Sequence, residues 1–576
     1  MPPSHPPSPV FAFAAGVIGH RPNRLPPESM AQIEARMAML LGALRAACVQ
    51  ARARHSACFD PSTEQMHLVT ALAEGADRIG AEEGLRQGFA LAAPLPFRIE
   101  EYEKDFATPQ ARQDFRRLLA AAHAVLEFNG SRAEEGKAYE QAGLAVLDAS
   151  DVLIAVWDGK PSAGRGGTPD LVYEAARRGM PVFHIHTAPE IPPRLHWAEP
   201  GHHSAAAYFE ESVAGDLESG IATMVERLVR PPRADSETAA MHDYFAQSFV
   251  RLNISMQFPL LMGLMGVRKP RLADLWRPDF ETAQRRAAAE MRGEGLAPAY
   301  VWADEIAVRF GQVFRGAFIA NFLIAALATI LAILSPAPPW SIVEILLVAL
   351  LIFNTMRGQR RHWHPLWFEA REVAERLRAA APLYAIGARA VLPRGEIPAW
   401  TGWYVRALLR QAGLHSAVLD AAGLAERTRS LRAFLQGQKD YHTRTAGRFD
   451  ALHRRLAVAG KYLFAAALVV PAVFFIMEIF HLAAVTPQMR RWVMIASAGL
   501  PAIAAALYGI RVTGDFEGAA RRSARMSEQL EHLLDKLQDG SLDSLRETSH
   551  RAAEVMLGDV SNWRLVMESR KLDVPG

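Results

Sequence analysis

Four apolar runs in the second half of the chain constrain the fold most strongly. Each is long enough to enter a bilayer and carries almost no charge: Ala317 to Leu334, Ser341 to Met356, Tyr462 to Phe480 and Trp492 to Ile510. Runs of about 18 apolar residues seldom occur in the cores of soluble proteins. We therefore predict four transmembrane helices, with four buried core helices of a soluble protein as the alternative.

The four runs form two hairpins. Pro-rich residues from Ser335 to Trp340 separate the first pair, and the segment Ala484 to Arg491 separates the second. Basic residues crowd the outer flanks: Arg309, Arg315, Arg357, Arg360, Arg361, Arg454, Arg455, Lys461 and Arg511. The positive-inside rule then predicts a multi-pass protein of the cytoplasmic (inner) membrane, with both termini and residues 357–461 in the cytoplasm. Only Arg490 and Arg491 disagree.

The length of 576 residues requires more than one domain, because single cores rarely exceed roughly 250 to 300 residues. We expect an α/β domain, then an all-α membrane part. The expected boundaries are a nucleotide-binding domain at 10–230, a helical linker at 231–315, hairpins at 316–356 and 462–510, a cytoplasmic helical segment at 357–461 and C-terminal cytoplasmic helices at 511–576.

Charge and cysteine content narrow the class further. The formal net charge is only +3, and no basic surface is concentrated in the sequence, so we expect no nucleic-acid partner. The two cysteines, Cys48 and Cys58, are too few for a disulfide framework and suit a reducing compartment. No motif for a bound metal is present, and we expect no resident cofactor and no metal.

The N-terminal region alternates strand-length apolar runs with helical patterns. This alternation predicts a Rossmann-like, doubly wound parallel sheet, whose ligands bind beyond the carboxyl ends of the strands. The expected strands are Phe11 to Ile18, Met66 to Leu72, Ala90 to Phe97, Ala124 to Phe128, Val152 to Trp157 and Pro181 to His186.

A glycine-rich turn follows the fifth of these strands and leads into a predicted helix, Pro169 to Gly179. Backbone N–H groups at such a helix start attract anions, usually phosphate. Loops after the first two strands should converge on the same edge. The candidate ligand-binding residues are therefore Gly19, His20, Arg21, Glu74, Gly75, Asp77, Arg78, Gly164, Arg165, Gly166, Gly167 and Thr168.

These motifs, in this order, resemble the SLOG superfamily, which includes LOG-type phosphoribohydrolases, DprA proteins and sensor domains for nucleotide-derived ligands. The resemblance covers about Val10 to His186. Besides the candidate residues other than Gly164 and Arg165, it rests on Ala76, Ala81, Glu82, Leu95, Pro96, Phe97, Tyr102, Asp105 and Phe106. It implies that the glycine turn cradles a phosphate of a nucleotide derivative, such as ADP-ribose, an NAD derivative or a cyclic nucleotide.

One position departs from the hydrolases of that superfamily. They carry a glutamate three residues after the threonine of the turn, where this chain has Leu171, with Asp170 before it and Glu174 one turn later. We therefore assign no catalytic residue and favour binding over hydrolysis. Structural roles remain open for several candidates: Gly166 and Gly167 in a tight turn, His20 as a cap or carbonyl partner, and Asp77 with Arg78 as an internal ion pair.

A charged helix follows each hairpin, at Trp367 to Leu383 and at Gly518 to Leu537. This organisation, with Arg371, Ala374 and Glu375, resembles the SLATT family of membrane hairpins, which occur joined to SLOG domains and are proposed as pore-forming effectors of bacterial defence. The resemblance implies a homo-oligomeric, ligand-gated effector that responds to a second messenger and acts on the lipid bilayer in antiviral defence. The alternatives are a membrane-tethered nucleotide or phosphoribosyl hydrolase, and a regulated channel or transporter.

Overall fold

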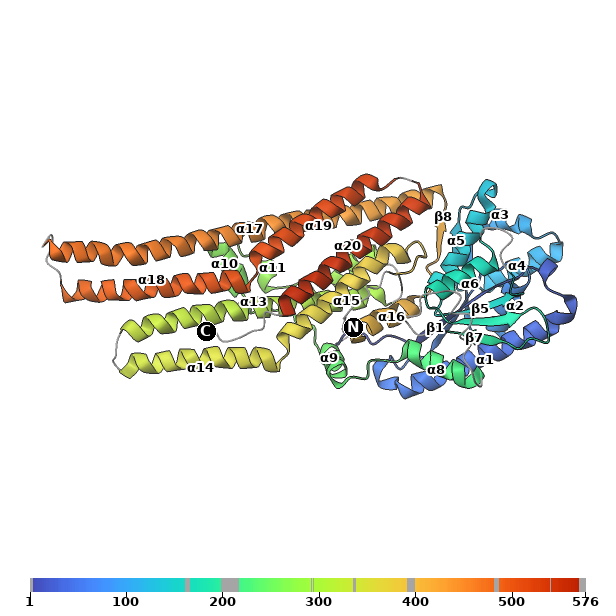
Figure 1. Ribbon diagram of the computed structural model, residues 1–576, viewed down its shortest axis with the longest axis horizontal. Coiled ribbons are helices and arrows are strands. Elements are labelled where there is room, and N and C mark those ends of the chain that lie inside the picture. Colours follow the sequence, from blue (N-terminus) through green and yellow to red (C-terminus); the bar gives the residue numbers. More distant parts are fainter. Residues whose placement is uncertain are drawn as a thin grey trace.

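The computed structural model describes residues 4–160, 166–197, 217–291, 293, 295–334, 338–390, 399–480, 486–538 and 540–568. Figure 1 shows an elongated molecule with an α/β domain at one end and long, roughly parallel helices at the other. Other helices, from three separate parts of the chain, lie between them. The predicted order, an α/β domain followed by an all-α membrane part, is confirmed.

The α/β domain is built on a sheet of eight described strands in the order β7-β6-β5-β1-β2-β3-β4-β8. All neighbours pair in parallel except β6 with β7. Each of the six predicted strands is present, and β7 and β8 are additional. The bounds are β1 Ala12–Gly19, β2 Gln65–Val69, β3 Ala90–Leu95, β4 Ala124–Phe128, β5 Val152–Trp157, β6 Val182–His186, β7 Arg194–His196 and β8 Ala417–Leu419.

Helices cover both faces of this sheet, so both are buried. Because side chains alternate between the two faces along a strand, one strand contributes to two cores. Phe13 and Val17 of β1 enter one core, together with the helices α1, α2, α4 and α8. Ala14 and Ile18 enter the other, which α5 and α6 cover. The bounds are α1 Met30–Arg54, α2 Ala76–Arg86, α3 Ile99–Tyr102, α4 Pro109–Ala121, α5 Glu135–Asp148, α6 Thr168–Arg177 and α8 Leu217–Val229.

Two helices of the membrane part extend well beyond a bilayer. At about 1.5 Å per residue, the 39 residues of α13 span about 58 Å and the 59 residues of α17 about 88 Å, against about 30 Å of hydrocarbon. The bounds are α9 Asp235–Phe245, α10 Gln257–Leu264, α11 Leu272–Leu275, α12 Phe280–Glu290, α13 Leu296–Leu334, α14 Pro338–Arg360, α15 Trp363–Tyr384, α16 Ala399–Ala412, α17 Ala421–Ile479, α18 Pro487–Thr513, α19 Phe516–Lys536 and α20 Leu542–Glu568.

Four of these helices are long and apolar enough to cross a membrane, and each contains one predicted span. The protein is therefore a membrane protein with four candidate spans, in α13, α14, α17 and the α18 segment. Arg490, which disagrees with the positive-inside pattern, forms an ion pair with Glu478 across the second hairpin. This pairing offsets its charge at that end of the hairpin. The cytoplasmic placement of both termini remains a prediction.

The charged helix α15 is buried, although its sequence has the composition of a solvated helix. Arg376 pairs with Glu372 at 2.7 Å, and Arg371 pairs with Glu375 at 2.5 Å. These i,i+4 pairs let the helix bury these four charges, because each of them faces a partner. The helix joins the end of α14 to the region beside the sheet (Figure 1).

Candidate functional site

The loops after β1 and before α2 meet at the carboxyl edge of the sheet. A methyl group added to Gly19 would lie 2.4 Å from Cβ of Ala76, and one added to Gly75 would lie 2.5 Å from the His20 carbonyl oxygen. Gly75 also has φ of +96°, where side chains are strained. The Ala76 N–H donates to that same carbonyl at 3.2 Å. The predicted convergence of these loops is therefore present.

His20 is buried beside an acid that the sequence analysis did not single out. Its Nε2 lies 3.0 Å from Oδ1 of Asp158, and Arg24 reaches the other carboxylate oxygen at 2.9 Å. Burial lowers the pKa of His20 although Asp158 acts in the opposite direction. Burial also opposes ionisation of Asp158, but the hydrogen bonds from His20, Lys160 and Arg24 bring its pKa down to about 2. Asp158 is thus an anion that neutralises this corner of the site.

Arg21 belongs to a second neutralised group, centred on Asp105. One oxygen of Asp105 lies 3.2 Å from Arg21 and the other 2.6 Å from Arg132, and the Tyr139 hydroxyl donates to the same carboxylate. Asp105 is nearly buried, with a side chain 5% exposed. The guanidinium of Arg21 also lies 5.2 Å from the centre of the Tyr139 ring. Arg132 and Tyr139 were absent from the predicted site.

Arg78 and Asp77 serve the loops that carry the site. Arg78 donates to the carbonyls of Leu72 at 3.2 Å and Ala111 at 2.8 Å, beneath the ring of Phe106. Asp77 accepts the N–H of Ala73 at 3.4 Å. Burial raises the pKa of Asp77 to about 7. The two side chains form no ion pair with each other, so that alternative is wrong: each is tied mainly to backbone. Glu74 beside them is half-buried.

The glycine turn precedes α6, as predicted, although Gly164 and Arg165 lie outside the described residues. Gly166 has φ of +80°, and a side chain there would lie 2.6 Å from the Gly136 carbonyl oxygen of α5. Gly167 occupies the N-cap of α6, which begins at Thr168. The N–H of Gly166 donates to Asp170 at 3.1 Å. An anion at this N–H therefore has to displace a carboxylate of the protein.

Leu171 and Glu174, which follow the glycine turn on α6, both make contacts away from the turn. Leu171 is buried, and a methyl group on Gly143 would lie 2.3 Å from its Cδ1, so the two helices α5 and α6 touch at this point. Glu174 binds Arg177 at 2.7 Å and Arg178 at 2.6 Å. Burial opposes its ionisation, but these arginines lower its pKa overall. Its carboxylate is thus engaged away from the turn.

No protein-family model matches the chain, and no curated protein matches it by sequence. The function of the carboxyl-edge site, which we define as His20, Arg21, Asp105, Asp158 and the turn at Gly166, therefore has to be inferred from its geometry and from the motifs in the sequence.

Proposed function

We propose that the protein is a membrane effector whose α/β domain binds a nucleotide-derived anion and thereby controls the permeability of the membrane. The observation that carries this proposal is β8. This strand comes from the segment between the two hairpins, yet it pairs with β4 as the edge strand of the sheet, with Leu126 opposite Ala417 and Phe128 opposite Leu419.

β8 is joined to a membrane helix by a single residue. Asp420 follows the strand and caps α17, with its side chain accepting the N–H of Gly423 at 2.8 Å. From there α17 continues without a break to Ile479. A helix is stiff along its axis, so a shift of the sheet edge is transmitted to the span rather than absorbed in a loop.

A shared core gives the sheet a second connection to the membrane helices. The cluster on the α5 and α6 face also contains Leu383 of α15, Leu431 of α17 and Leu530 of α19. These helices are continuous with, or follow directly after, the spans in α14, α17 and α18. Packed cores adopt discrete arrangements. A ligand that changes how the α/β domain packs in this shared core therefore favours one arrangement of the membrane helices over another.

The ligand class follows from the glycine turn and from the SLOG resemblance. The turn at Gly166 and Gly167 presents backbone N–H groups at the start of α6, which suits a phosphate. An ADP-ribose or NAD derivative or a cyclic nucleotide is the ligand class we propose. By its resemblance to SLATT hairpins, the membrane part acts as an oligomeric pore in bacterial antiviral defence.

Binding without turnover is the better proposal for this site. Leu171 is buried in the contact with α5, and Glu174 is engaged by two arginines. The remaining carboxylate at the turn, that of Asp170, accepts the N–H of Gly166 at 3.1 Å, so all three positions are engaged in contacts other than with a glycosidic bond. The ligand is therefore expected to remain intact while bound.

A thermal-shift experiment on the detergent-solubilised chain tests the site. NAD, ADP-ribose and cyclic oligonucleotides are added to the parent, to Gly167→Asp and to Gly437→Asp. A bound ligand raises the melting temperature by mass action. Gly437 has open space around it on α17, so its variant adds the same charge away from the site. We expect the shift to be clearly smaller in Gly167→Asp than in the parent and in Gly437→Asp; an unchanged shift in Gly167→Asp would contradict the proposed site.

A further inference from the structure

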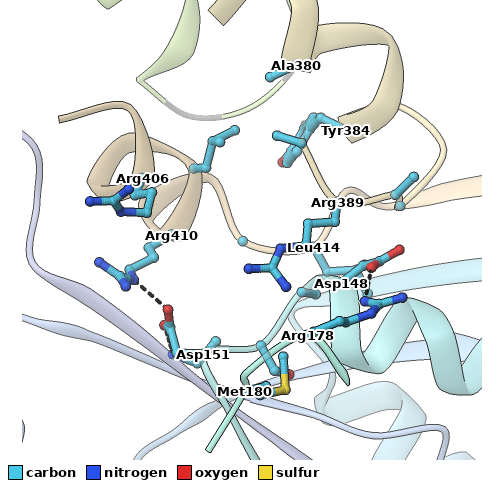
Figure 2. Close-up of a pocket in the computed structure, with 18 of the residues that line it drawn as sticks. Asp148, Asp151, Arg178, Met180, Ala380, Tyr384, Arg389, Arg406, Arg410 and Leu414 are labelled. Carbon is cyan, nitrogen blue, oxygen red and sulfur yellow. Dashed lines mark hydrogen bonds and ion pairs between the residues drawn. The ribbon is translucent and has the colours of Figure 1, made fainter. Parts of the chain in front are cut away.

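A cavity of about 360 Å³ lies at the opposite, amino edge of the sheet. Asp151 before β5 and Met180 before β6 line its floor, and residues of α15, α16 and the segment after α15 form its roof (Figure 2). We call it the amino-edge cavity. It is lined jointly by the α/β domain and by the segment between the two hairpins, so an occupant contacts both.

The acids of the amino-edge cavity are already paired. Asp148 binds Arg178 at 2.6 Å, and Asp151 binds Arg410 at 2.6 Å. Asp151 also accepts the N–H of Ala14 at 3.0 Å. Each of the two carboxylates therefore already has an arginine as its ion-pair partner.

Two further arginines line the same cavity without such a partner. Among the described residues, neither Arg389 nor Arg406 takes part in any hydrogen bond or ion pair. Arg389 points into the middle of the cavity in Figure 2, and Arg406 lies one helical turn before Arg410 on α16. Solvent reaches both side chains. The amino-edge cavity thus holds two guanidinium groups that no carboxylate of the described residues contacts.

The surroundings of these arginines are unfavourable for their charge. Burial among protein atoms and then the charge of Arg410 lower the pKa of Arg406 to about 10. Burial and then the charge of Arg178 lower the pKa of Arg389. Asp148 and Asp151 act in the opposite direction on Arg389, and Asp151 does so on Arg406, but they do not reverse the shift of either pKa, so both arginines lie in an unfavourable place for a cation. An anion in the cavity makes that place more favourable.

We propose that the amino-edge cavity binds a small organic phosphate, with Arg389 and Arg406 holding the phosphate. A guanidinium binds phosphate oxygens in a two-pronged geometry, and a phosphate monoester carries close to two negative charges at neutral pH. Met180, Leu414 and Tyr384 supply apolar and aromatic surface for the organic part. The volume is in the range of pockets for small molecules.

The phosphate comes from a soluble molecule and not from a lipid headgroup. The cavity touches the end of α15 at Ala380 and Tyr384, whereas the helix starts at Trp363, next to the end of the α14 span. Its 22 residues extend about 33 Å at 1.5 Å per residue, and Figure 1 shows α15 leading away from the spans toward the sheet. Lipid headgroups do not extend that far.

Calorimetric titration of the full chain in detergent with inorganic pyrophosphate tests this site. The variant is Arg389→Ala with Arg406→Ala, and the matched control is Arg429→Ala, which removes an exposed arginine of α17. All three proteins, of which the otherwise unchanged chain is the background, also carry Gly167→Asp, which removes binding at the carboxyl-edge site. The measured binding therefore reports on the amino-edge cavity, whether or not the carboxyl-edge site exists. We expect pyrophosphate to bind the background and the control, and to bind the double variant about tenfold more weakly or worse.

The stability of the free variant separates a binding role from a structural one. If the two arginines served the fold, their removal would lower the melting temperature. Because they lie in an unfavourable place for a cation, we expect an equal or higher melting temperature together with the lost binding. Failure of the background protein to bind pyrophosphate, or equal affinity in the double variant, would overturn the proposal. If the double variant does not fold, each single variant is judged by the same two measurements.

Discussion

The arginines at the two edges of the sheet differ in whether they contact a carboxylate. At the carboxyl edge Arg21, Arg24 and Arg132 each contact a carboxylate, Asp105 or Asp158. At the amino edge Arg389 and Arg406 contact none among the described residues. Each of these arginines of the carboxyl edge thus has a carboxylate partner, whereas the two arginines of the amino-edge cavity have none among the described residues.

This difference implies different modes of binding. An anion that enters the carboxyl-edge site competes with Asp105, Asp158 and Asp170, so binding there has to rearrange ion pairs. Rearrangement of pairs that hold loops together is what a switch requires. An anion in the amino-edge cavity meets preplaced arginines, so it binds with little rearrangement and fixes the two parts of the protein against each other.

The largest change in unfolding free energy is expected for Asp105→Ala. This variant makes the carboxyl edge resemble the amino edge, because it removes a carboxylate partner from two arginines. The change removes the carboxylate that Arg21, Arg132 and Tyr139 share, although Arg132 keeps Glu101 and Glu135, and we expect a loss of roughly 2 to 3 kcal/mol of unfolding free energy. The same variant should bind pyrophosphate more tightly at this edge. Melting temperature and calorimetry measure both, with Asp114→Ala, which removes a partly exposed aspartate of α4, as the control. Tight binding without loss of stability would contradict the role assigned to Asp105.

A second, smaller effect is the pH dependence of the unfolding free energy that Asp77 causes. Its pKa of about 7 lies above its ordinary value, so the folded protein holds the proton that the unfolded chain releases. The stability from protonated Asp77 is therefore present below about pH 4 and is lost as pH rises through 7. Asp77→Asn should match the parent at pH 4 and exceed it by about 2 kcal/mol at pH 8. A constant difference across this range would contradict the assignment.

The sequence predicts the carboxyl edge far better than the amino edge. The six strands and four spans arise from local periodicity and length, so they are visible without a structure. Asp158 can also be predicted from the sequence, because it directly follows β5 at the edge of the sheet where ligands bind. β8 has only three residues, too few for a pattern. The amino-edge cavity joins Arg178, Arg389 and Arg406 across distant parts of the chain, and only tertiary packing brings them together.

The smallest effect is expected for Arg406→Ala alone. Removing one of several like charges should raise the unfolding free energy by about 0.5 kcal/mol at low salt, since exposure to solvent screens most of the repulsion. The gain should fade in about 1 M salt, where the Debye length is short. Melting temperatures at two salt concentrations, with Arg429→Ala as the control, measure it. A loss of stability at low salt would show that Arg406 is a structural residue.

Dye release from proteoliposomes tests most directly whether the α/β domain controls the membrane. The parent, Gly167→Asp and Gly437→Asp are reconstituted around a self-quenched dye, and the compound from the NAD, ADP-ribose and cyclic oligonucleotide panel that gives the largest thermal shift is added. Moving an assembly from almost closed to almost open needs a preference of about 5.5 kcal/mol between the two states, which several subunits can share. We predict release with the parent and Gly437→Asp, none with Gly167→Asp, and the ligand recovered intact. Leakage that the ligand does not change, accompanied by its steady consumption, would show that the protein is a hydrolase and contradict the proposal.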